Sequence, residues 1–240
     1  MTARLATILA RAGSKGLRDK NIRPFLGEPL LVRSVKQALN CGVFDAVAFS
    51  SDSEEYLEIA RAAGAHVLVR RPVEFATDAI TKLPAIRQAA NLAESELGQR
   101  FDVITDLAVT SPMRSDQDIL GAVSLLENLN ARLILSACLA KDNPYFNLVE
   151  PIEGSQGFAL SKVIDRKISA RQAAPEVFAL NGAVYVWARE ELLKTDDSVV
   201  RGYARIFQMN HERSIDIDTE LDFKIAEFLC ISRLKGNING

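Results

Sequence analysis

A basic, glycine-containing segment near the amino terminus has the residue types needed to bind a polyanion. Residues 11–23 contain five cations and one acid, Asp19. Gly13 and Gly16 allow the backbone to turn tightly, so that successive N–H groups can point at one anion. Several fixed donors suit a triphosphate, and the same composition also fits an ordinary solvated basic loop. The five cations are Arg11, Lys15, Arg18, Lys20 and Arg23.

Two aspartates near the carboxyl terminus form a second candidate group. Asp216 and Asp218 alternate with isoleucines, and residues 214–217 are expected to form a strand. Because residues i and i+2 of a strand point to the same face, both carboxylates are expected on one side. Two neighbouring carboxylates repel each other unless a cation lies between them. Mg²⁺ is a suitable cation, because it binds a few carboxylate oxygens and keeps water or phosphate oxygens as its other ligands. The alternative is that Asp218 or Thr219 caps the following helix.

Together, the basic loop and the acidic pair predict a nucleoside triphosphate and Mg²⁺ as ligands. Phosphoryl and nucleotidyl transfer need positioning, charge neutralisation and an in-line nucleophile more than covalent chemistry from the protein. The sequence contains neither GxxxxGK(S/T) nor GxGxxG. This absence argues against a P-loop kinase and against a nicotinamide dehydrogenase.

Apolar runs alternate with helix-length segments through the first 140 residues. Ser53 and Ser115 are expected helix N-caps, and Gly42 and Gly64 lie where helices are expected to end. This alternation is typical of βαβ units, so we expect an α/β fold with a mostly parallel sheet between helical layers. The basic loop follows the first strand, where such sheets bind ligands. Strands are expected at 5–10, 46–50, 66–69, 103–109 and 133–137, and helices at 30–39, 54–63, 83–97 and 116–129.

Between about residues 143 and 183 the pattern is interrupted by prolines and glycines. Short strands are expected at 145–149 and 157–161, in an excursion from the main sheet. Further strands are expected at 183–188 and 205–209. An amphipathic helix over 219–233 is expected to follow, with Leu221, Ile225, Phe228 and Leu229 on one stripe.

The composition excludes several classes of protein. A chain of 240 residues with 48% apolar and 25% charged residues is typical of one globular domain and not of a disordered chain. A net charge of −2 gives no sign of a nucleic-acid partner. No apolar run approaches the ~18–20 residues of a membrane span, and no signal sequence is evident. Three widely spaced cysteines favour a reducing compartment, so we expect a cytoplasmic protein.

An ordered set of motifs resembles the cytidylyltransferases that activate acidic keto-sugars, especially the CMP-N-acylneuraminate synthetases. The first motif, residues 9–21, and the last, residues 214–220, are the most specific. The motifs keep their order over essentially the whole chain, although each is weak alone. The others lie at residues 50–52, 71–78, 110–114, 171–172 and 181–182.

The resemblance implies a three-layer, Rossmann-like nucleotidyltransferase fold and a Mg²⁺-dependent reaction. Residues 1–240 would form a single domain, with residues 140–182 as a small β-rich arm that builds a homodimer and reaches into the neighbour's site. The anomeric hydroxyl of a nine-carbon 2-keto-3-deoxy sugar acid would attack the α-phosphorus of CTP, giving a CMP-sugar and pyrophosphate. An eight-carbon, Kdo-type cytidylyltransferase and a non-catalytic nucleotide-binding dimer are the alternatives.

The resemblance also implies roles for individual residues. The catalytic set would be Arg11, Lys20, Asp216 and Asp218, with the two aspartates holding the metal. Arg11 and Lys20 would neutralise charge on the leaving pyrophosphate. No histidine is suitably placed as a base, so a metal-polarised hydroxyl is expected to lose its proton with help from an aspartate. CTP would be held by Arg11, Gly13, Ser14, Lys15, Lys20, Asn21 and Arg71, and the sugar by Lys141, Arg171, Gln172 and Asn181.

The sequence departs from the sialic acid enzymes at the sugar end. Ala108 replaces a common glutamine, and Ala179 and Leu180 replace an Arg-Pro pair. The CTP end is intact. A legionaminic-type or deaminated nine-carbon acid is therefore as good a candidate for the substrate as N-acetylneuraminic acid, and residues 143–146 are candidates for the same pocket.

Overall fold

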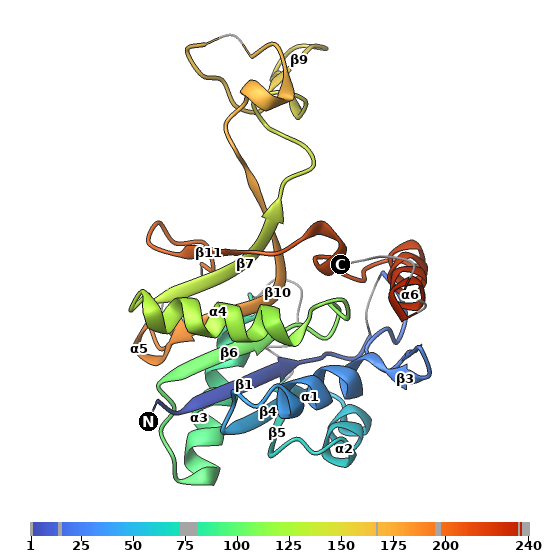
Figure 1. Ribbon diagram of the computed structural model, residues 1–240, viewed down its shortest axis with the longest axis vertical. Coiled ribbons are helices and arrows are strands. Elements are labelled where there is room, and N and C mark those ends of the chain that lie inside the picture. Colours follow the sequence, from blue (N-terminus) through green and yellow to red (C-terminus); the bar gives the residue numbers. More distant parts are fainter. Residues whose placement is uncertain are drawn as a thin grey trace.

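A seven-stranded sheet forms the centre of the computed structural model, which describes residues 2–13, 16–72, 81–166, 168–194, 198–234 and 236 (Figure 1). The strand order is β11-β7-β10-β6-β1-β4-β5. Neighbouring strands are parallel except that β10 runs antiparallel to both β6 and β7. The strands are β1 (Arg4–Leu9), β4 (Ala46–Ser51), β5 (Val67–Arg70), β6 (Val103–Leu107), β7 (Leu133–Leu139), β10 (Phe178–Ala188) and β11 (Arg205–Gln208).

Helices cover both faces of this sheet. One face is covered by α1 (Leu30–Asn40), α2 (Glu54–Ala62), α4 (Asp116–Asn128) and α6 (Glu220–Leu234), whose apolar residues share one core cluster. The other face is covered by α3 (Leu83–Leu97) and the short α5 (Arg189–Leu192), in a second cluster. The predicted three-layer, mostly parallel α/β fold is thus confirmed.

Local sequence signals place the helix ends correctly. The Ser53 hydroxyl accepts a hydrogen bond from the Tyr56 N–H at the start of α2. Ser115 forms a capping box with Asp118 at the start of α4, which satisfies two backbone groups reciprocally. Gly42 and Gly64 have positive φ angles just beyond α1 and α2, as residues that end helices commonly do.

The chain between β7 and β10 leaves the sheet and projects from the body as a narrow arm (Figure 1). It contains the antiparallel strands β8 (Val149–Pro151) and β9 (Phe158–Leu160) and the 3₁₀ turn η2 (Arg171–Ala173). The strand expected at 145–149 is wrong over most of its length. The Asn143 side chain accepts from the Tyr145 N–H, and the Asn143 carbonyl accepts from three following N–H groups, so the chain turns there.

The segment before α6 also differs from the prediction. Residues 214–217 form no strand. They follow the 3₁₀ turn η3 (His211–Arg213), and their backbone groups are bonded elsewhere: the Ser214 N–H donates to the His211 carbonyl, and the Ile217 carbonyl accepts from Lys20. A ladder with a neighbouring strand is therefore not formed, and the prediction that strand alternation aligns the two aspartates is wrong.

Helix α6 is confirmed, but its buried face is not the predicted one. Phe223 and Ala226 are buried, whereas Leu221 and Phe228 are both 66% exposed. The helix carries apolar residues on several faces, so its periodicity did not identify the side that packs. Within the described residues, no helix combines the length and apolar character that a membrane span requires.

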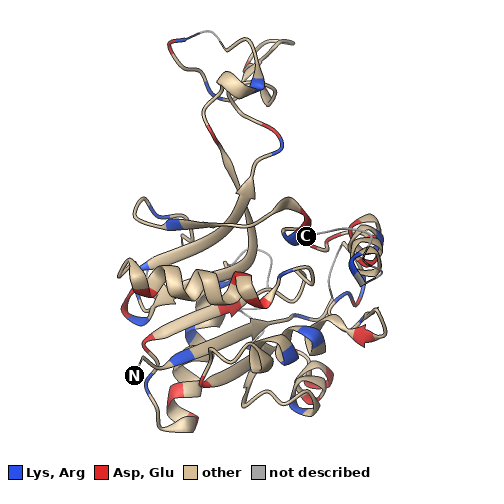
Figure 2. Cartoon of the chain, in the orientation of Figure 1, with Lys and Arg blue, Asp and Glu red and all other residues tan. Residues whose placement is uncertain are grey.

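The charged residues are spread over the molecule. Figure 2 shows acidic and basic positions interspersed on helices, loops and strand ends, in keeping with the net charge of −2. The remaining short elements are the β2 (Pro24–Phe25) and β3 (Glu28–Pro29) hairpin, which follows the basic loop and leads into α1.

Candidate active site

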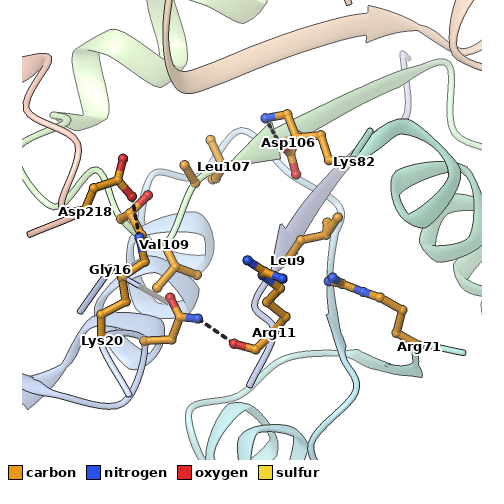
Figure 3. Close-up of a pocket in the computed structure, with 13 residues that line it drawn as sticks. Leu9, Arg11, Gly16, Lys20, Arg71, Lys82, Asp106, Leu107, Val109 and Asp218 are labelled. Carbon is orange, nitrogen blue, oxygen red and sulfur yellow. Dashed lines mark hydrogen bonds and ion pairs between the residues drawn. The ribbon is translucent and has the colours of Figure 1, made fainter. Parts of the chain in front are cut away.

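A cleft of 440 Å³ opens where the carboxyl ends of β1 and β6 meet (Figure 3). These two strands are parallel neighbours, so the loops that follow them lie at one edge of the sheet, the usual ligand-binding edge of such folds. Five residues predicted for the nucleotide and metal line the cleft: Arg11, Lys20, Asn21, Arg71 and Asp218. The other lining residues are Leu9, Gly16, Lys82, Asp106, Leu107, Ala108, Val109 and Thr110.

Lys20 joins the basic loop to the acidic segment. Its ammonium donates to Asp218 Oδ1 and to the Ile217 carbonyl, both at 2.7 Å, across 198 and 197 positions of sequence. The Lys20 side chain is only 14% exposed. Arg23 and Glu220 add a bidentate ion pair beside it. The two segments that the sequence predicts to act together therefore lie in direct contact.

Gly16 is placed where no side chain fits. A Cβ atom built there would lie 2.4 Å from the carbonyl oxygen of Asp218. The backbone of the basic loop thus approaches the backbone of the acidic segment too closely for any other residue. Gly13, predicted to contact CTP, has a φ of 70° and open space around it. Ser14 and Lys15 lie outside the described residues.

Thr219, and not Asp218, caps helix α6. Thr219 Oγ1 accepts from the Asp222 N–H at 3.2 Å, and Asp222 Oδ2 accepts from the Thr219 N–H at 2.7 Å. This reciprocal arrangement is a capping box. The Asp218 carboxylate is therefore free of capping and points to Lys20 at the cleft.

Asp216 faces a second pocket of 370 Å³, which it lines together with Asn181, Ser214 and Tyr185. The residue Asp216 as a whole is exposed. Its carboxylate is nevertheless surrounded by enough protein that the loss of hydration raises the pKa of Asp216. The negative charge of Asp218 raises that pKa further, while a hydrogen bond from Thr110 opposes the change. The two carboxylates therefore interact, although each opens into a different pocket.

The acidic pair offers carboxylate oxygens, the ligand type that Mg²⁺ prefers. In the described part of the chain, no group of three or more His, Cys, Asp or Glu side chains is placed to hold a metal. Two carboxylates are the usual protein share of a Mg²⁺ site, because this ion keeps waters and takes phosphate oxygens. Asp216 and Asp218 would supply two such carboxylates.

Two arginines shape the opposite side of the cleft. Arg71 is buried and donates to the Ser50 carbonyl at 3.0 Å, and burial lowers its pKa. The Arg11 carbonyl accepts from the Asn21 side chain at 3.0 Å, which fixes the start of the basic loop. Figure 3 shows the guanidinium groups of Arg11 and Arg71 facing the same cavity. Most of the motif at 71–78 lies outside the described residues.

One ion pair in the cleft was not predicted from the sequence. Lys82 donates to Asp106 Oδ2 at 2.6 Å, and the Asp106 side chain is 3% exposed. An aspartate within the mostly apolar run at 103–109 was the signal that could have found it, because buried carboxylates occur where they have a partner. The partner could not be identified from spacing, since it comes from the start of a helix.

The predicted sugar-binding residues are divided between two places. Asn181 is buried beside the second pocket, where it accepts from Ser136 Oγ at 2.6 Å. Lys141, Arg171 and Gln172 are exposed in the arm and line neither of the two pockets. Arg171 donates to the Lys141 carbonyl and lies 3.8 Å from the Asp142 carboxylate.

Known proteins are similar to this chain over nearly its full length. CMP-N,N'-diacetyllegionaminic acid synthase of Campylobacter jejuni subsp. jejuni serotype O:2 is 39% identical over 225 residues, covering 94% of each chain. Post-translational flagellin modification protein B of Campylobacter coli is 37% identical over 233 residues, covering 95% of each. N-acylneuraminate cytidylyltransferase of Escherichia coli is 30% identical over 92% of this chain and 51% of its own length.

Solved structures share the fold at low sequence identity. CMP:2-keto-3-deoxy-manno-octonic acid synthetase complexed with CTP superposes with a TM-score of 0.69 at 15% identity, covering 97% of this chain and all of that one. 4-Diphosphocytidyl-2C-methyl-D-erythritol synthase of Anaerococcus prevotii gives a TM-score of 0.64 at 14% identity, covering 96% of each. A sequence profile of the cytidylyltransferases matches residues 5–201. The predicted family is thereby confirmed: the chain belongs to the cytidylyltransferase family.

Proposed function

We propose that this protein transfers CMP from CTP to the anomeric hydroxyl of a nine-carbon 2-keto-3-deoxy sugar acid, with release of pyrophosphate. The observation that carries the proposal is the contact of Lys20 with Asp218 beside a cleft that also holds Arg11 and Arg71. Relatives at 30–39% identity, named for legionaminic and neuraminic acids, favour the nine-carbon class over the eight-carbon alternative.

Different cations of the cleft are proposed to bind different parts of the nucleotide. Arg71, held rigidly by Ser50, serves the cytosine end. Arg11 and Lys20 serve the phosphates, where charge grows on the leaving pyrophosphate as the reaction proceeds. Gly13, Ser14, Lys15 and Asn21 complete the proposed contacts of the loop with CTP. Because Lys20, Asn21 and Arg71 are already held by hydrogen bonds to the protein, little reorganisation of these side chains accompanies the transfer.

Asp216 and Asp218 are the proposed holders of Mg²⁺. When bound, the ion supplies positive charge at the phosphates and polarises the attacking hydroxyl. Asp216 lies at the second pocket, where the sugar acid is proposed to bind next to Asn181. An aspartate of the site accepts the proton that the hydroxyl loses.

The arm is the proposed dimerisation element. Its apolar side chains are exposed in the single chain, Val163 by 80% and Phe158 by 66%. A second copy would bring Lys141, Arg171 and Gln172 to the sugar end of its neighbour's site. A planar guanidinium suits a sugar carboxylate because it can bind both oxygens.

Gly16→Ala is expected to lower kcat/KM for CTP about tenfold, because the new methyl group must displace the loop from the Asp218 backbone, and small misplacements are costly in a catalytic site. Steady-state kinetics of pyrophosphate release measures the effect. Gly202→Ala is the matched control, since a Cβ there meets no atom within 4 Å. Equal kinetics for both variants would show that the close approach has no role in catalysis.

Arg171→Ala is expected to raise KM for the sugar acid about tenfold, the value of a lost charge-assisted hydrogen bond, and to change KM for CTP much less. Varying one substrate at a time separates the two constants. Arg100→Ala removes an exposed arginine on the main body and serves as the control. A larger effect on CTP than on the sugar would show that Arg171 is misplaced in the proposal.

The decisive assay measures pyrophosphate release with CTP and a panel of keto-acids. The panel holds N-acetylneuraminic acid, its deaminated form, a legionaminic acid and Kdo. We expect release with nine-carbon acids and little with Kdo. A preference for Kdo would support the eight-carbon alternative, and CTP binding without release on any acid would support the non-catalytic dimer.

A further inference from the structure

The Lys82–Asp106 pair occupies a well-defined place between the core and the cleft. Asp106 on β6 is the register partner of Thr7 on β1 and of Tyr185 on β10, so the three side chains form a row across one face of the sheet. Along β6, Ile104 before Asp106 is buried in the core, and Ala108 after it lines the cleft. The pair therefore lies at the boundary between the buried core and the cleft.

Packing alone does not account for a carboxylate at this position. A buried charge loses hydration, and a buried ion pair is often no more stable than well-packed apolar residues of similar size. Asp106 holds Lys82 at 2.6 Å, and the Lys82 ammonium lies 4.5 Å from the centre of the Tyr185 ring. Asp106 and Tyr185 thus position one ammonium group, and the side chain of Lys82 remains 32% exposed at the cleft.

The position of Lys82 relative to the other cations indicates what it faces. Figure 3 shows Lys20 with Asp218 on one side of the cavity, Lys82 with Asp106 on another, and Arg71 beside Arg11 on a third. Tyr185, whose ring lies beside the Lys82 ammonium, also lines the second pocket together with Asp216. The ammonium therefore faces the same cleft as Arg71 at the proposed cytosine end and Asp218 of the acidic pair, the cleft in which the proposed function puts the phosphates of the nucleotide.

We infer that Lys82 binds the α-phosphoryl group of the nucleotide, the group that is transferred, and that Asp106 and Tyr185 are positioning residues for its ammonium. This inference rests on the proposed function. In the transfer, the anomeric oxygen forms a bond to the α-phosphorus, and the bond from that phosphorus to the bridging oxygen breaks. The electron pair of that bond leaves with pyrophosphate, and the hydroxyl proton passes to a carboxylate of the site. Lys82 neutralises the non-bridging oxygens throughout.

The test compares binding of cytidine, CMP and CTP by calorimetric titration. Lys82→Met is expected to weaken CMP and CTP about tenfold, the cost of a lost charge-assisted hydrogen bond, and to leave cytidine unchanged. It is expected to lower kcat by about 10–10²-fold, and Lys82→Arg is expected to regain part of both losses. Lys36→Met removes a lysine paired with Glu28 on the surface and is the matched control.

A double variant separates binding from folding. Lys82→Met leaves Asp106 buried without its cation, which lowers the melting temperature. In Lys82→Met/Asp106→Leu both charges are gone, so stability is expected to return while the affinity for CMP stays low. Recovery of CMP affinity in the double variant would overturn the inference, because Lys82 would then act only in folding.

Two other results would also overturn it. Unchanged CMP binding in Lys82→Met with a higher KM for the sugar acid would place Lys82 at the acceptor. Equal weakening of cytidine, CMP and CTP would indicate a general disturbance of the cleft. If the wild-type protein bound no cytidine nucleotide, the proposed function itself would fall, and this inference with it.

Discussion

Lys20→Met is expected to lower kcat about 10²–10³-fold, comparable to the loss of one donor that stabilises a developing oxyanion. Lys20 is held at the cleft by Asp218 and by the Ile217 carbonyl, both at 2.7 Å, so its ammonium is already positioned before substrate arrives. Loss of the charge removes one of the two cations, Arg11 and Lys20, that are proposed to neutralise the leaving pyrophosphate. Methionine keeps the apolar stem, which limits the change in packing.

The same substitution separates two roles of Lys20. Because Lys20 also ties the basic loop to the acidic segment, KM for CTP is expected to rise together with the fall in kcat. Melting temperature and steady-state kinetics, measured beside the surface control Lys36→Met, separate a loosened loop from lost stabilisation of the transition state. Normal turnover in Lys20→Met would remove the basic loop from the proposed mechanism.

Asp218→Asn is expected to lower kcat by about 10²-fold or more, since a metal ion contributes several kcal/mol of charge stabilisation and each 1.36 kcal/mol is about a tenfold change in rate. It is also expected to raise the Mg²⁺ concentration needed for half-maximal activity. The Asp218 carboxylate is not used to cap helix α6, because Thr219 and Asp222 form that cap, and at the cleft it contacts Lys20.

A magnesium titration of pyrophosphate release measures both effects. The neutral amide that replaces the Asp218 carboxylate cannot form an ion pair with Lys20, so Lys20→Met is the reference for loss of that pair: it is expected to change kcat without the same shift in Mg²⁺ dependence. Glu28→Gln removes a surface carboxylate and is the matched control. A fully active Asp218→Asn enzyme with an ordinary Mg²⁺ requirement would refute the metal role.

The elements with strong local signals were predictable. Helix α3 spans Leu83–Leu97, as its apolar periodicity predicts, and the parallel strands lie within a few residues of the expected runs. The failures are segments whose structure depends on distant side chains. The backbone groups of residues 214–217 bond to Lys20, His211 and Thr110 instead of to a neighbouring strand. The buried face of α6 depended on which apolar side met the sheet.

Residue types and their spacing were sufficient to predict a mostly parallel α/β protein and to single out a basic, glycine-containing loop and an acidic pair, because propensity, periodicity and charge are properties of short segments. Only the tertiary structure determines which charged side chains come into contact. Lys20 reaches Asp218 because the loop after β1 and the segment before α6 converge at one edge of the sheet. Lys82 reaches Asp106 because α3 begins beside the end of β6, a proximity set by strand order and crossovers.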